Sequence, residues 1–411
     1  MKITVNPKSI DLKIVAPGSK SACQRAVAIA ALSEFETVIH KVTFSDDVKA
    51  ALSIAEKLGN EIIHTDNSVK IIPAERNKNN QLNCGESGLA IRMFGSVASL
   101  VHEKFTISGK GSLNSRPVNF ICETLTSAGL NCETENNRPP IHISGRLNGQ
   151  TTEIDGSQSS QILTGLLISL PLIKEDSTLR VKNLKSKPYI DLTLNIMKHF
   201  GVKVKPIDYK EFRILGRQKY HAKSYHTEGD WSAAAFLFVA GAVAGRTEVT
   251  GLNIHSTQGD KTIMTAIENA GAKINSSENT ITVEKSELKA FTFNAVDCPD
   301  LFPPLVSLAF NCEGTTVIKG IHRLKHKESN RAAVLQKEYA KLGGKIILKN
   351  DSMYITGKQL SGGITHSTGD HRIAMALSVS ALTASEPVVI KNADSINKSY
   401  PNFYSDIQIK C

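Results

Sequence analysis

Residues 230–284 read DWSAAAFLFVAGAVAGRTEVTGLNIHSTQGDKTIMTAIENAGAKINSSENTITVE. The stretch opens with an apolar run long enough for a buried helix, and a Thr/Val-rich segment that favours a strand follows it. A second, amphipathic helix is expected from about Gln258 to Gly271, because glycine is typical of the end of a helix. The alternating residues after Gly271 predict a hairpin of two strands. This stretch therefore predicts a helix, a strand, a helix and a strand pair.

The same order of segments recurs along the whole chain. The apolar runs start near Ser21, Ser87, Ser159, Asp230, Pro299 and Asp370, and the second helices start near Asp47, Pro117, Tyr189, Gln258, Glu328 and Tyr400. Both markers advance by about 70 residues per copy, which indicates an internal repeat. We therefore expect an α/β protein of six βαβαββ-type repeats, with the sixth copy cut short at Cys411.

The length of the chain bears on the number of domains. Its 411 residues exceed what one hydrophobic core usually serves, so two domains of three repeats each are expected. A hinge is predicted near residues 228–230, between the third and fourth copies. The first strand, KITVNP, precedes the first copy and could pair with either domain.

Composition narrows the class of protein. The net charge of +10 fits nucleic acid, a membrane surface or small anionic substrates as partners. Aromatic residues make up only 6% and no nucleic-acid-binding motif occurs, so nucleic acid is the minority interpretation. The N-terminus has no apolar signal region and the apolar runs are too short to span a bilayer, which predicts a soluble cytoplasmic protein. The seven cysteines form no CxxC pair or Cys/His cluster, so we expect buried thiols, no disulfide framework and no metal site.

The starts of the apolar helices are candidate anion sites, because free N–H groups and partial positive charge gather there. At the first start Lys20 and Arg25 could address one phosphate, although a Ser cap with surface cations is the alternative. At the second start Gly88 allows close approach and Arg92 lies one turn inside, with a buried Glu86–Arg92 pair as the alternative. The third start offers the hydroxyl and amide groups of residues 157–161, which serve a phosphate or merely cap the helix.

The second half of the chain places acids at the corresponding points. Asp230, Asp300 and Asp370 precede apolar runs, where an acid is most often a helix cap. The fifth copy is dense in charge, and Lys327, Glu328 and Arg331 share one helix face.

Ten short motifs carry a resemblance to a known family. They are PGSKS with Arg25, ESG with Arg92, SRP at Arg116, SSQ at 159–161, SKPYID at 186–191, EGD at 228–230, QGD at 258–260, KESNR, GDHRIAM and KSYP. In this order they closely resemble the enolpyruvyl transferases of the shikimate pathway, the 3-phosphoshikimate 1-carboxyvinyltransferase family.

The resemblance implies a two-domain inside-out α/β barrel. One domain would consist of residues 1–18 and 229–411, the other of residues 19–228, with the active site in the cleft between them. It implies transfer of the enolpyruvyl group of phosphoenolpyruvate to the 5-hydroxyl of shikimate 3-phosphate by addition and elimination. It also implies a cytoplasmic monomer that binds small anionic substrates, uses no cofactor or metal, and has no nucleic-acid or membrane partner.

The resemblance assigns roles to individual residues. Shikimate 3-phosphate would be held by Lys20, Ser21, Arg25, Ser159, Ser160, Gln161, Ser186, Asp300 and Lys327. Phosphoenolpyruvate would be held by Lys20, Gly88, Arg116, Gln161, Arg331, Arg372 and Lys398. Asp300 and Glu328 would be the acid/base groups, and Lys20 would stabilise charge in the transition state.

Three positions depart from the pattern of the family. Glu86 stands in place of a usual Asn, Leu89 in place of Thr, and Asn330 in place of Asp. These departures bear on the surroundings of phosphoenolpyruvate more than on the reaction.

Three rival functions fit the sequence less well. UDP-N-acetylglucosamine enolpyruvyl transferases carry a loop cysteine where this chain has Gly111. RNA 3′-terminal phosphate cyclases need a nucleophilic histidine, whereas His371 is expected to orient the helix start beside Arg372. A non-catalytic member would have lost at least one of the residues Lys20, Asp300, Glu328 and Arg372, and all four are present.

Overall fold

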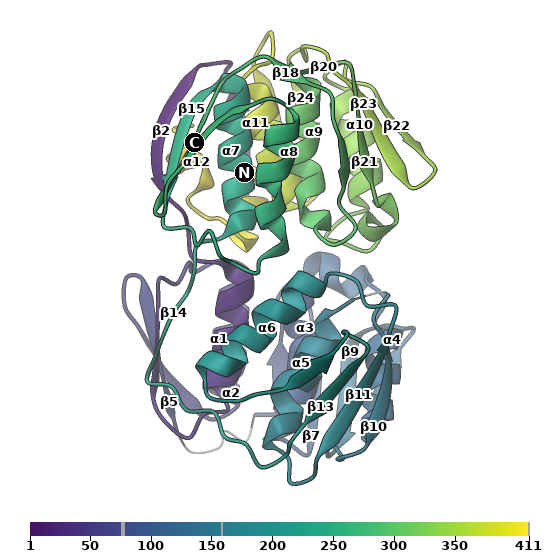
Figure 1. The fold of residues 1–411 in the computed structure, drawn as a ribbon. Coiled ribbons are helices and arrows are strands. Elements are labelled where there is room, and N and C mark those ends of the chain that lie inside the picture. The colour runs from purple at the N-terminus through teal and green to yellow at the C-terminus, as the bar shows by residue number, and fades with distance from the viewer. Residues whose placement is uncertain (75–78, 158, 410–411) are drawn as a thin grey trace. The chain divides into compact units, whose positions relative to one another are not determined.

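The computed structural model describes residues 1–74, 79–157 and 159–409. The chain forms two compact units, shown in Figure 1. One unit is the continuous segment Gly18–Thr227, and the other combines Met1–Pro17 with Glu228–Cys411. Each unit has a hydrophobic core of its own. We call them the continuous unit and the split unit.

Three buried helices occupy the centre of the continuous unit. They are α1 (Lys20–Ala30), α3 (Gly88–Ala98) and α5 (Gln161–Ser169). Helix α3 packs against both α1 and α5. These segments are apolar on nearly every side, so they are stable as helices only where other elements surround them. Each repeat of this unit has a second helix: α2 (Asp46–Lys57), α4 (Asn119–Ser127) and α6 (Lys187–His199).

Three four-stranded sheets of identical topology complete this unit. In spatial order they are β14 (Ser224–His226), β3 (Thr37–His40), β5 (Ser68–Pro73) and β4 (Asn60–His64); β6 (Gln81–Asn83), β7 (Lys104–Ser108), β9 (Arg138–Gly145) and β8 (Leu130–Glu135); and β10 (Thr151–Asp155), β11 (Ser177–Lys182), β13 (Glu211–Ile214) and β12 (Lys205–Ile207). In each sheet the first two strands are parallel and the other pairs antiparallel. Alternate side chains of a strand such as β10 are buried, which directs one face of the sheet toward the core.

The split unit repeats this plan. Its buried helices α7 (Trp231–Ala244), α9 (Phe302–Phe310) and α11 (His371–Ala381) lie side by side and contact one another (Figure 1). Every residue of α7 is buried. The second helices are α8 (Ile263–Asn269), α10 (Arg331–Ala340) and α12 (Phe403–Asp406).

Two sheets of the split unit have the same strand order, and the third has only the first three of these positions filled. They are β2 (Ile10–Val15), β15 (Gly245–Thr250), β17 (Thr280–Glu284) and β16 (Lys273–Ser276); β19 (Thr292–Asn294), β21 (Thr315–Lys319), β23 (Ser352–Thr356) and β22 (Ile346–Lys349); and β24 (Gly363–His366), β25 (Val388–Lys391) and β1 (Lys2–Val5). Two further short strands, β18 (Leu288–Lys289) and β20 (Cys312–Glu313), pair in parallel as a separate two-stranded sheet.

Two strands of the split unit come from the start of the chain. Strand β1 runs antiparallel to β25, with Lys2 opposite Lys391, and takes the place that the last strand of a repeat has in the other sheets. Strand β2 runs parallel to β15, from Gly245 opposite Ile10 to Thr250 opposite Val15. The sixth copy is thus cut short as expected: its sheet has three strands, and one of them, β1, comes from the other end of the sequence.

The cysteines depart in one respect from what the sequence predicts. Cys23, Cys84, Cys298 and Cys312 are free and buried, as expected, whereas Cys122 and Cys132 form a disulfide. Their Cα atoms are 4.9 Å apart because α4 packs on β8, a tertiary contact that cysteine spacing does not reveal. Cys411 lies outside the described residues.

Neither a membrane-spanning helix nor a metal-binding group of side chains occurs in the described residues. Within residues 1–74, 79–157 and 159–409, no helix is long and apolar enough to cross a membrane. The same residues contain no group of three or more His, Cys, Asp or Glu side chains placed to hold a metal ion.

Candidate active site

The residues that the sequence singles out fall into two sets, one in each unit. The first set belongs to the continuous unit and lies at the starts of α1, α3, α5 and α6 and at the end of the short helix η1 (Gly111–Ser115). It consists of Lys20, Ser21, Arg25, Gly88, Arg92, Arg116, Ser159, Ser160, Gln161 and Ser186. The second set belongs to the split unit and consists of Asp300, Lys327, Glu328, Arg331, Asp370, Arg372 and Lys398.

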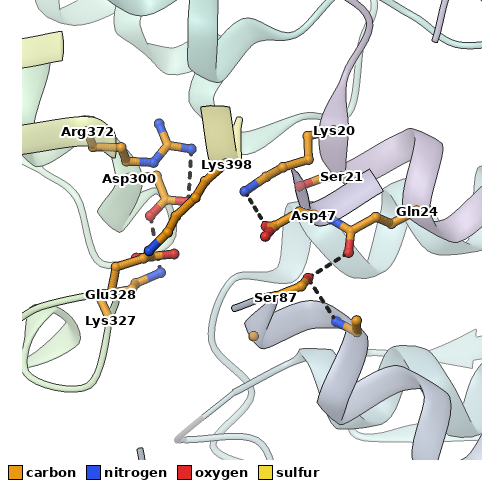
Figure 2. Close-up of polar contacts among 12 residues, drawn as sticks. Lys20, Ser21, Gln24, Asp47, Ser87, Asp300, Lys327, Glu328, Arg372 and Lys398 are labelled. Carbon is orange, nitrogen blue, oxygen red and sulfur yellow. Dashed lines mark hydrogen bonds and ion pairs between the residues drawn. The ribbon is translucent and has the colours of Figure 1, made fainter. Parts of the chain in front are cut away.

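Lys20 is the first residue of α1. The helix is capped by Ser19, whose Oγ accepts a hydrogen bond from the backbone N–H of Ala22 at 3.4 Å. The ammonium group of Lys20 lies 2.8 Å from Oδ2 of Asp47, in the first turn of α2, as Figure 2 shows. The sequence marks Lys20 as an anion-binding residue but does not reveal this partner.

Arg25 is a buried cation one turn into α1. Its Nε donates to Oγ1 of Thr193 at 2.9 Å, and its Nη1 donates to the backbone carbonyl of Ser21 at 2.8 Å. Burial lowers the pKa of Arg25 to about 10, so the guanidinium stays charged at neutral pH. Within the described part of the chain all its hydrogen-bond acceptors are uncharged oxygens. A buried positive charge with such partners favours the approach of an anion.

Gly88, at the start of α3, lies against two guanidinium groups. A Cβ atom at this position would lie 2.8 Å from Nη1 of Arg116 and 2.9 Å from Nη1 of Arg92, so a side chain does not fit without displacing them. Arg92 Nη1 also donates to Oε1 of Gln161 at 2.6 Å. The starts of α3 and α5 thus bring two cations and one amide group together, an arrangement suited to a phosphate or a carboxylate.

The loop before Arg116 is held by Glu86. Oε2 of this carboxylate accepts hydrogen bonds from the backbone N–H and the Oγ of Ser112, at 2.8 and 2.7 Å. The loop passes so close to Glu86 that a Cβ at Gly111, which has a φ of +50°, would lie 2.5 Å from its carboxyl carbon. Glu86, one of the departures from the family pattern, therefore fixes the loop that carries Arg116.

The hydroxyl groups of the first set surround the starts of α5 and α6. Ser159 Oγ accepts from the backbone N–H of Gln161 at 3.2 Å, and Ser160 is buried beside it. Ser186 precedes α6 in the left-handed region, with a φ of +55°, a conformation that costs free energy for a residue with a side chain. Such a strained backbone conformation persists only where the surrounding structure holds it in place. Residues of this kind are common at ligand sites.

In the second set the fully buried Arg331 joins three carboxylates. Its Nε donates to Oδ2 of Asp370 at 2.8 Å, its Nη1 to Oδ1 of Asp300 at 2.6 Å, and its Nη2 to Glu328. Coulomb attraction from these carboxylates outweighs burial and holds the pKa of Arg331 well above its usual range. Asn330, which stands where the family usually has Asp, caps α10. Its side chain accepts a hydrogen bond from the backbone N–H of Ala333 at 3.4 Å and so stabilises the start of the helix.

Asp300 is the carboxylate on which the cations of the second set converge. Its Oδ1 lies 3.2 Å from Lys327 Nζ and 2.6 Å from Arg331 Nη1, and its Oδ2 lies 3.4 Å from Arg372 Nη2. Burial alone would raise the pKa of Asp300, but Arg372, Lys327 and Arg331 together hold it well below its usual range. Asp300 is therefore ionised at neutral pH.

The remaining cations stand around the start of α11. Asp370 caps this helix by accepting from the backbone N–H of Arg372 at 3.0 Å, and also accepts from Ser329 Oγ at 3.0 Å. The buried Lys398 donates from Nζ to the backbone carbonyl of Gly369 at 2.7 Å. Figure 2 shows Asp300, Lys327, Glu328, Arg372 and Lys398 gathered at this end of the split unit.

Three side chains near the two sets were not predicted as site residues. Asp47 is paired with Lys20, and Gln24 Oε1 accepts from Ser87 Oγ at 2.8 Å. Asp260 is buried and accepts a hydrogen bond from Ser232. Burial and the nearby charge of Asp300 raise the pKa of Asp260 to about 6. The QGD motif contained the signal for Asp260, but the contacts of these residues depend on tertiary structure.

Comparison with known proteins gives a consistent result. The family model described as EPSP synthase (3-phosphoshikimate 1-carboxyvinyltransferase) matches residues 5–407. A protein of Clostridium novyi (strain NT) described as 3-phosphoshikimate 1-carboxyvinyltransferase is 36% identical, over 99% of this chain and 96% of the relative. A Clostridium kluyveri protein of the same description is also 36% identical, with the same shares covered.

A solved structure agrees in fold. The EPSP synthase of Acinetobacter baumannii superposes with a TM-score of 0.82, at 24% identity, over 99% of this chain and 97% of that one. The expected fold class, an α/β protein of the inside-out type with repeated units, is confirmed by this likeness.

Proposed function

The chain belongs to the EPSP synthase family, whose model spans residues 5–407, and we propose that the two sets of residues described above carry out its reaction. The activity is that of a 3-phosphoshikimate 1-carboxyvinyltransferase of the shikimate pathway, which leads to the aromatic amino acids. The enolpyruvyl group of phosphoenolpyruvate is transferred to the 5-hydroxyl of shikimate 3-phosphate, and phosphate is released.

Both sets contribute to each substrate in this proposal. Shikimate 3-phosphate contacts Lys20, Ser21, Arg25, Ser159, Ser160, Gln161, Ser186, Asp300 and Lys327. Phosphoenolpyruvate contacts Lys20, Gly88, Arg116, Gln161, Arg331, Arg372 and Lys398. The two substrates carry two phosphates and two carboxylates, and the buried Arg25 and the two guanidiniums at Gly88 support cationic binding of such groups.

The reaction requires proton transfers in both of its steps. In the addition step the 5-hydroxyl oxygen forms a bond to C2 of phosphoenolpyruvate and loses its proton, while C3 gains a proton and becomes a methyl group. In the elimination step C3 loses a proton, the C2–C3 double bond forms again and the C2–O bond to phosphate breaks. One acid/base group is needed near C3 and one near the hydroxyl.

Asp300 and Glu328 are the proposed acid/base groups. Both lie against Arg331, so their charge is compensated while a proton is held or released. Because three cations keep Asp300 ionised, it is suited to accept a hydrogen bond from the 5-hydroxyl. Lys20 is proposed to stabilise the charge that develops in the transition state.

The rival acceptor in this fold is UDP-N-acetylglucosamine. The loop before Arg116 has Gly111 where the cell-wall enzymes have a cysteine, and the two Clostridium relatives are described as 3-phosphoshikimate 1-carboxyvinyltransferases. Both observations support shikimate 3-phosphate.

The location and state of the protein are also proposals. We propose a cytoplasmic monomer whose partners are small anionic substrates, with no nucleic-acid or membrane partner and no cofactor. Light scattering during gel filtration should give one 44.6 kDa chain per particle, and a mass of two chains would reject the monomer.

The function is tested by phosphate release from phosphoenolpyruvate. Release with shikimate 3-phosphate alone as acceptor is the expected result. Release only with UDP-N-acetylglucosamine would assign the chain to the cell-wall reaction, and release with neither acceptor would favour a non-catalytic role.

A further inference from the structure

We propose that Asp47 is a positioning residue, which holds the ammonium group of Lys20 at the start of α1 in the orientation that a substrate phosphate requires. The inference deepens the function proposed above and rests on it, because Lys20 is the residue through which Asp47 would act. None of the motifs that carry the family resemblance includes Asp47.

The contact between the two side chains is short and shielded from water. Lys20 Nζ lies 2.8 Å from Asp47 Oδ2, and the side chains are only 13% and 10% exposed. Both residues belong to the continuous unit, in which α1 packs against α2. An ion pair at this depth is screened much less by salt than a pair on the surface.

Lys20 needs a counter-charge because of where it stands. It is the first residue of α1, and the first turn of that helix contains no acidic residue. The partial positive charge of a helix N-terminus repels an ammonium group, so Lys20 on its own would turn away toward solvent. Asp47 lies in the first turn of α2, where the same partial charge favours a carboxylate.

The backbone around the pair keeps the two helix starts at a fixed separation. Gly18, two residues before Lys20, approaches the carbonyl of Lys41 so closely that a Cβ would lie 1.9 Å from its oxygen. The segment after Lys41 leads to α2, whose residues Val48 and Ala51 are fully buried in the core. The Asp47 carboxylate is thus carried on a rigid support.

The pairing has a chemical consequence for Lys20. An ammonium group has three N–H donors, and a bond to Asp47 fixes its rotation. A substrate phosphate then meets an ammonium group that is already oriented, so its binding costs less side-chain freedom. Removal of Asp47 would leave the cation present but poorly oriented, which costs rate more than it costs stability.

The chain provides a matched control for the test. Asp46 is the preceding residue in the same helix turn and is exposed, so Asp46→Asn removes the same charge without touching Lys20. We expect Asp47→Asn to lower kcat/KM about 50-fold, through orientation of a catalytic cation, and Asp46→Asn to change it less than twofold. Equal thermal unfolding of the two variants would show that the fold is kept.

A double-mutant cycle separates positioning from a structural role. In a Lys20→Met background, Asp47→Asn should cost less than a further twofold, because the residue it orients is gone. An additional loss of about 50-fold in that background, or a single Asp47→Asn variant as active as the wild type, would overturn the proposal. If Asp47→Asn does not fold, Asp47→Glu replaces it, with an expected loss of about fivefold against less than twofold for Asp46→Glu.

The proposed function fails by a different outcome. It fails if the wild type and Asp46→Asn both release no phosphate from phosphoenolpyruvate with shikimate 3-phosphate. The positioning role fails when those two proteins are active and either Asp47→Asn is as active as they are or it costs about a further 50-fold in the Lys20→Met background.

Discussion

Asp300 and Glu328 share Arg331 but differ in their surroundings. Asp300 also contacts Lys327 and Arg372, and these cations hold its pKa well below the usual range for an aspartate. A carboxylate with so low a pKa is a weak base, since proton affinity falls with pKa. Asp300 is therefore suited to hold a hydroxyl group through a hydrogen bond, and Glu328 is the other carboxylate proposed for proton transfer.

Glu328→Gln tests this assignment. The amide keeps the size of the side chain but cannot exchange a proton, so turnover should fall by a factor of about 10² to 10⁴. Shikimate 3-phosphate binding should change only a few-fold, as measured by isothermal titration calorimetry. Glu278→Gln, in an exposed turn, is the control with full activity. Turnover near that of the wild type would remove Glu328 from the mechanism.

Asp370→Asn tests how much the pairing of Asp370 with Arg331 contributes to the free energy of unfolding. Asp370 is fully buried and accepts two hydrogen bonds from Arg331, so the substitution leaves part of a buried positive charge without its counter-ion. Loss of one partner of a buried pair costs about 3–5 kcal/mol in the free energy of unfolding. Urea unfolding should detect this decrease. A loss under about 1 kcal/mol would show that Arg331 is neutralised by Asp300 and Glu328 alone.

Asp260 predicts how stability depends on pH. Its folded-state pKa of about 6 lies above the value in an unfolded chain, so the folded state binds the proton more tightly. The stability that this protonation provides is present at low pH and is lost as the pH rises toward 6. Between pH 4.5 and 7.0 the wild type should lose about 2 kcal/mol more than Asp260→Asn in urea unfolding. An equal loss in both proteins would contradict a raised pKa.

At the scale of elements, the long apolar runs could be predicted and the short strands could not. The runs that begin near Ser87 and Asp230 form α3 and α7, because a segment apolar on every side has no stable place except inside a core. Strands such as β6 and β19 have three residues each, too few for a periodic pattern. Their pairing with β7 and β21 decides that they are strands.

The disulfide between α4 and β8 should stabilise the second repeat. Closing the ten-residue separation of Cys122 and Cys132 restricts the unfolded chain, for a gain of about 3 kcal/mol at most. Without reductant, Cys132→Ser should therefore unfold at a lower temperature than the wild type. With dithiothreitol the two melting temperatures should converge. Identical melting in both conditions would mean that the pair stays reduced in solution.

In the candidate site too, local motifs could be predicted from the sequence, whereas contacts between helices could not. The motifs located Lys20, Arg25, Gly88 and Arg331 at or near helix starts, because hydroxyl groups, glycines and cations before an apolar run have few other uses. The ion pair between Lys20 and Asp47 depends on how α2 packs against α1, so no local sequence pattern predicts it.

At the scale of the whole molecule, the two units differ in how their sequence is arranged. The continuous unit contains all the strands of its sheets between residues 18 and 227, including β14 beside β3. The split unit takes β1 and β2 from residues before Pro17. The repeat predicts a hinge near residues 228–230, whereas the contribution of β1 and β2 depends on pairing between segments more than 200 residues apart.

Two fragments test this difference. Residues 18–227 should fold alone, with a cooperative thermal transition, because the fragment has a complete core and complete sheets. Residues 228–411 should remain partly unfolded, since β15 and β25 lack partners, and should fold when a peptide of residues 1–17 is added. Circular dichroism would follow both. Folding of residues 228–411 without the peptide would show that β1 and β2 are dispensable.

The pairing of β1 with β25 sets an order of events during synthesis. A ribosome adds about 5–20 residues per second, so roughly 20–80 s separate the appearance of β1 from that of its partner. The continuous unit is finished during this interval, while the first strands of the nascent chain wait without partners. The unpaired edges of β1 and β2 are therefore open to pairing with other chains until β15 and β25 have been made.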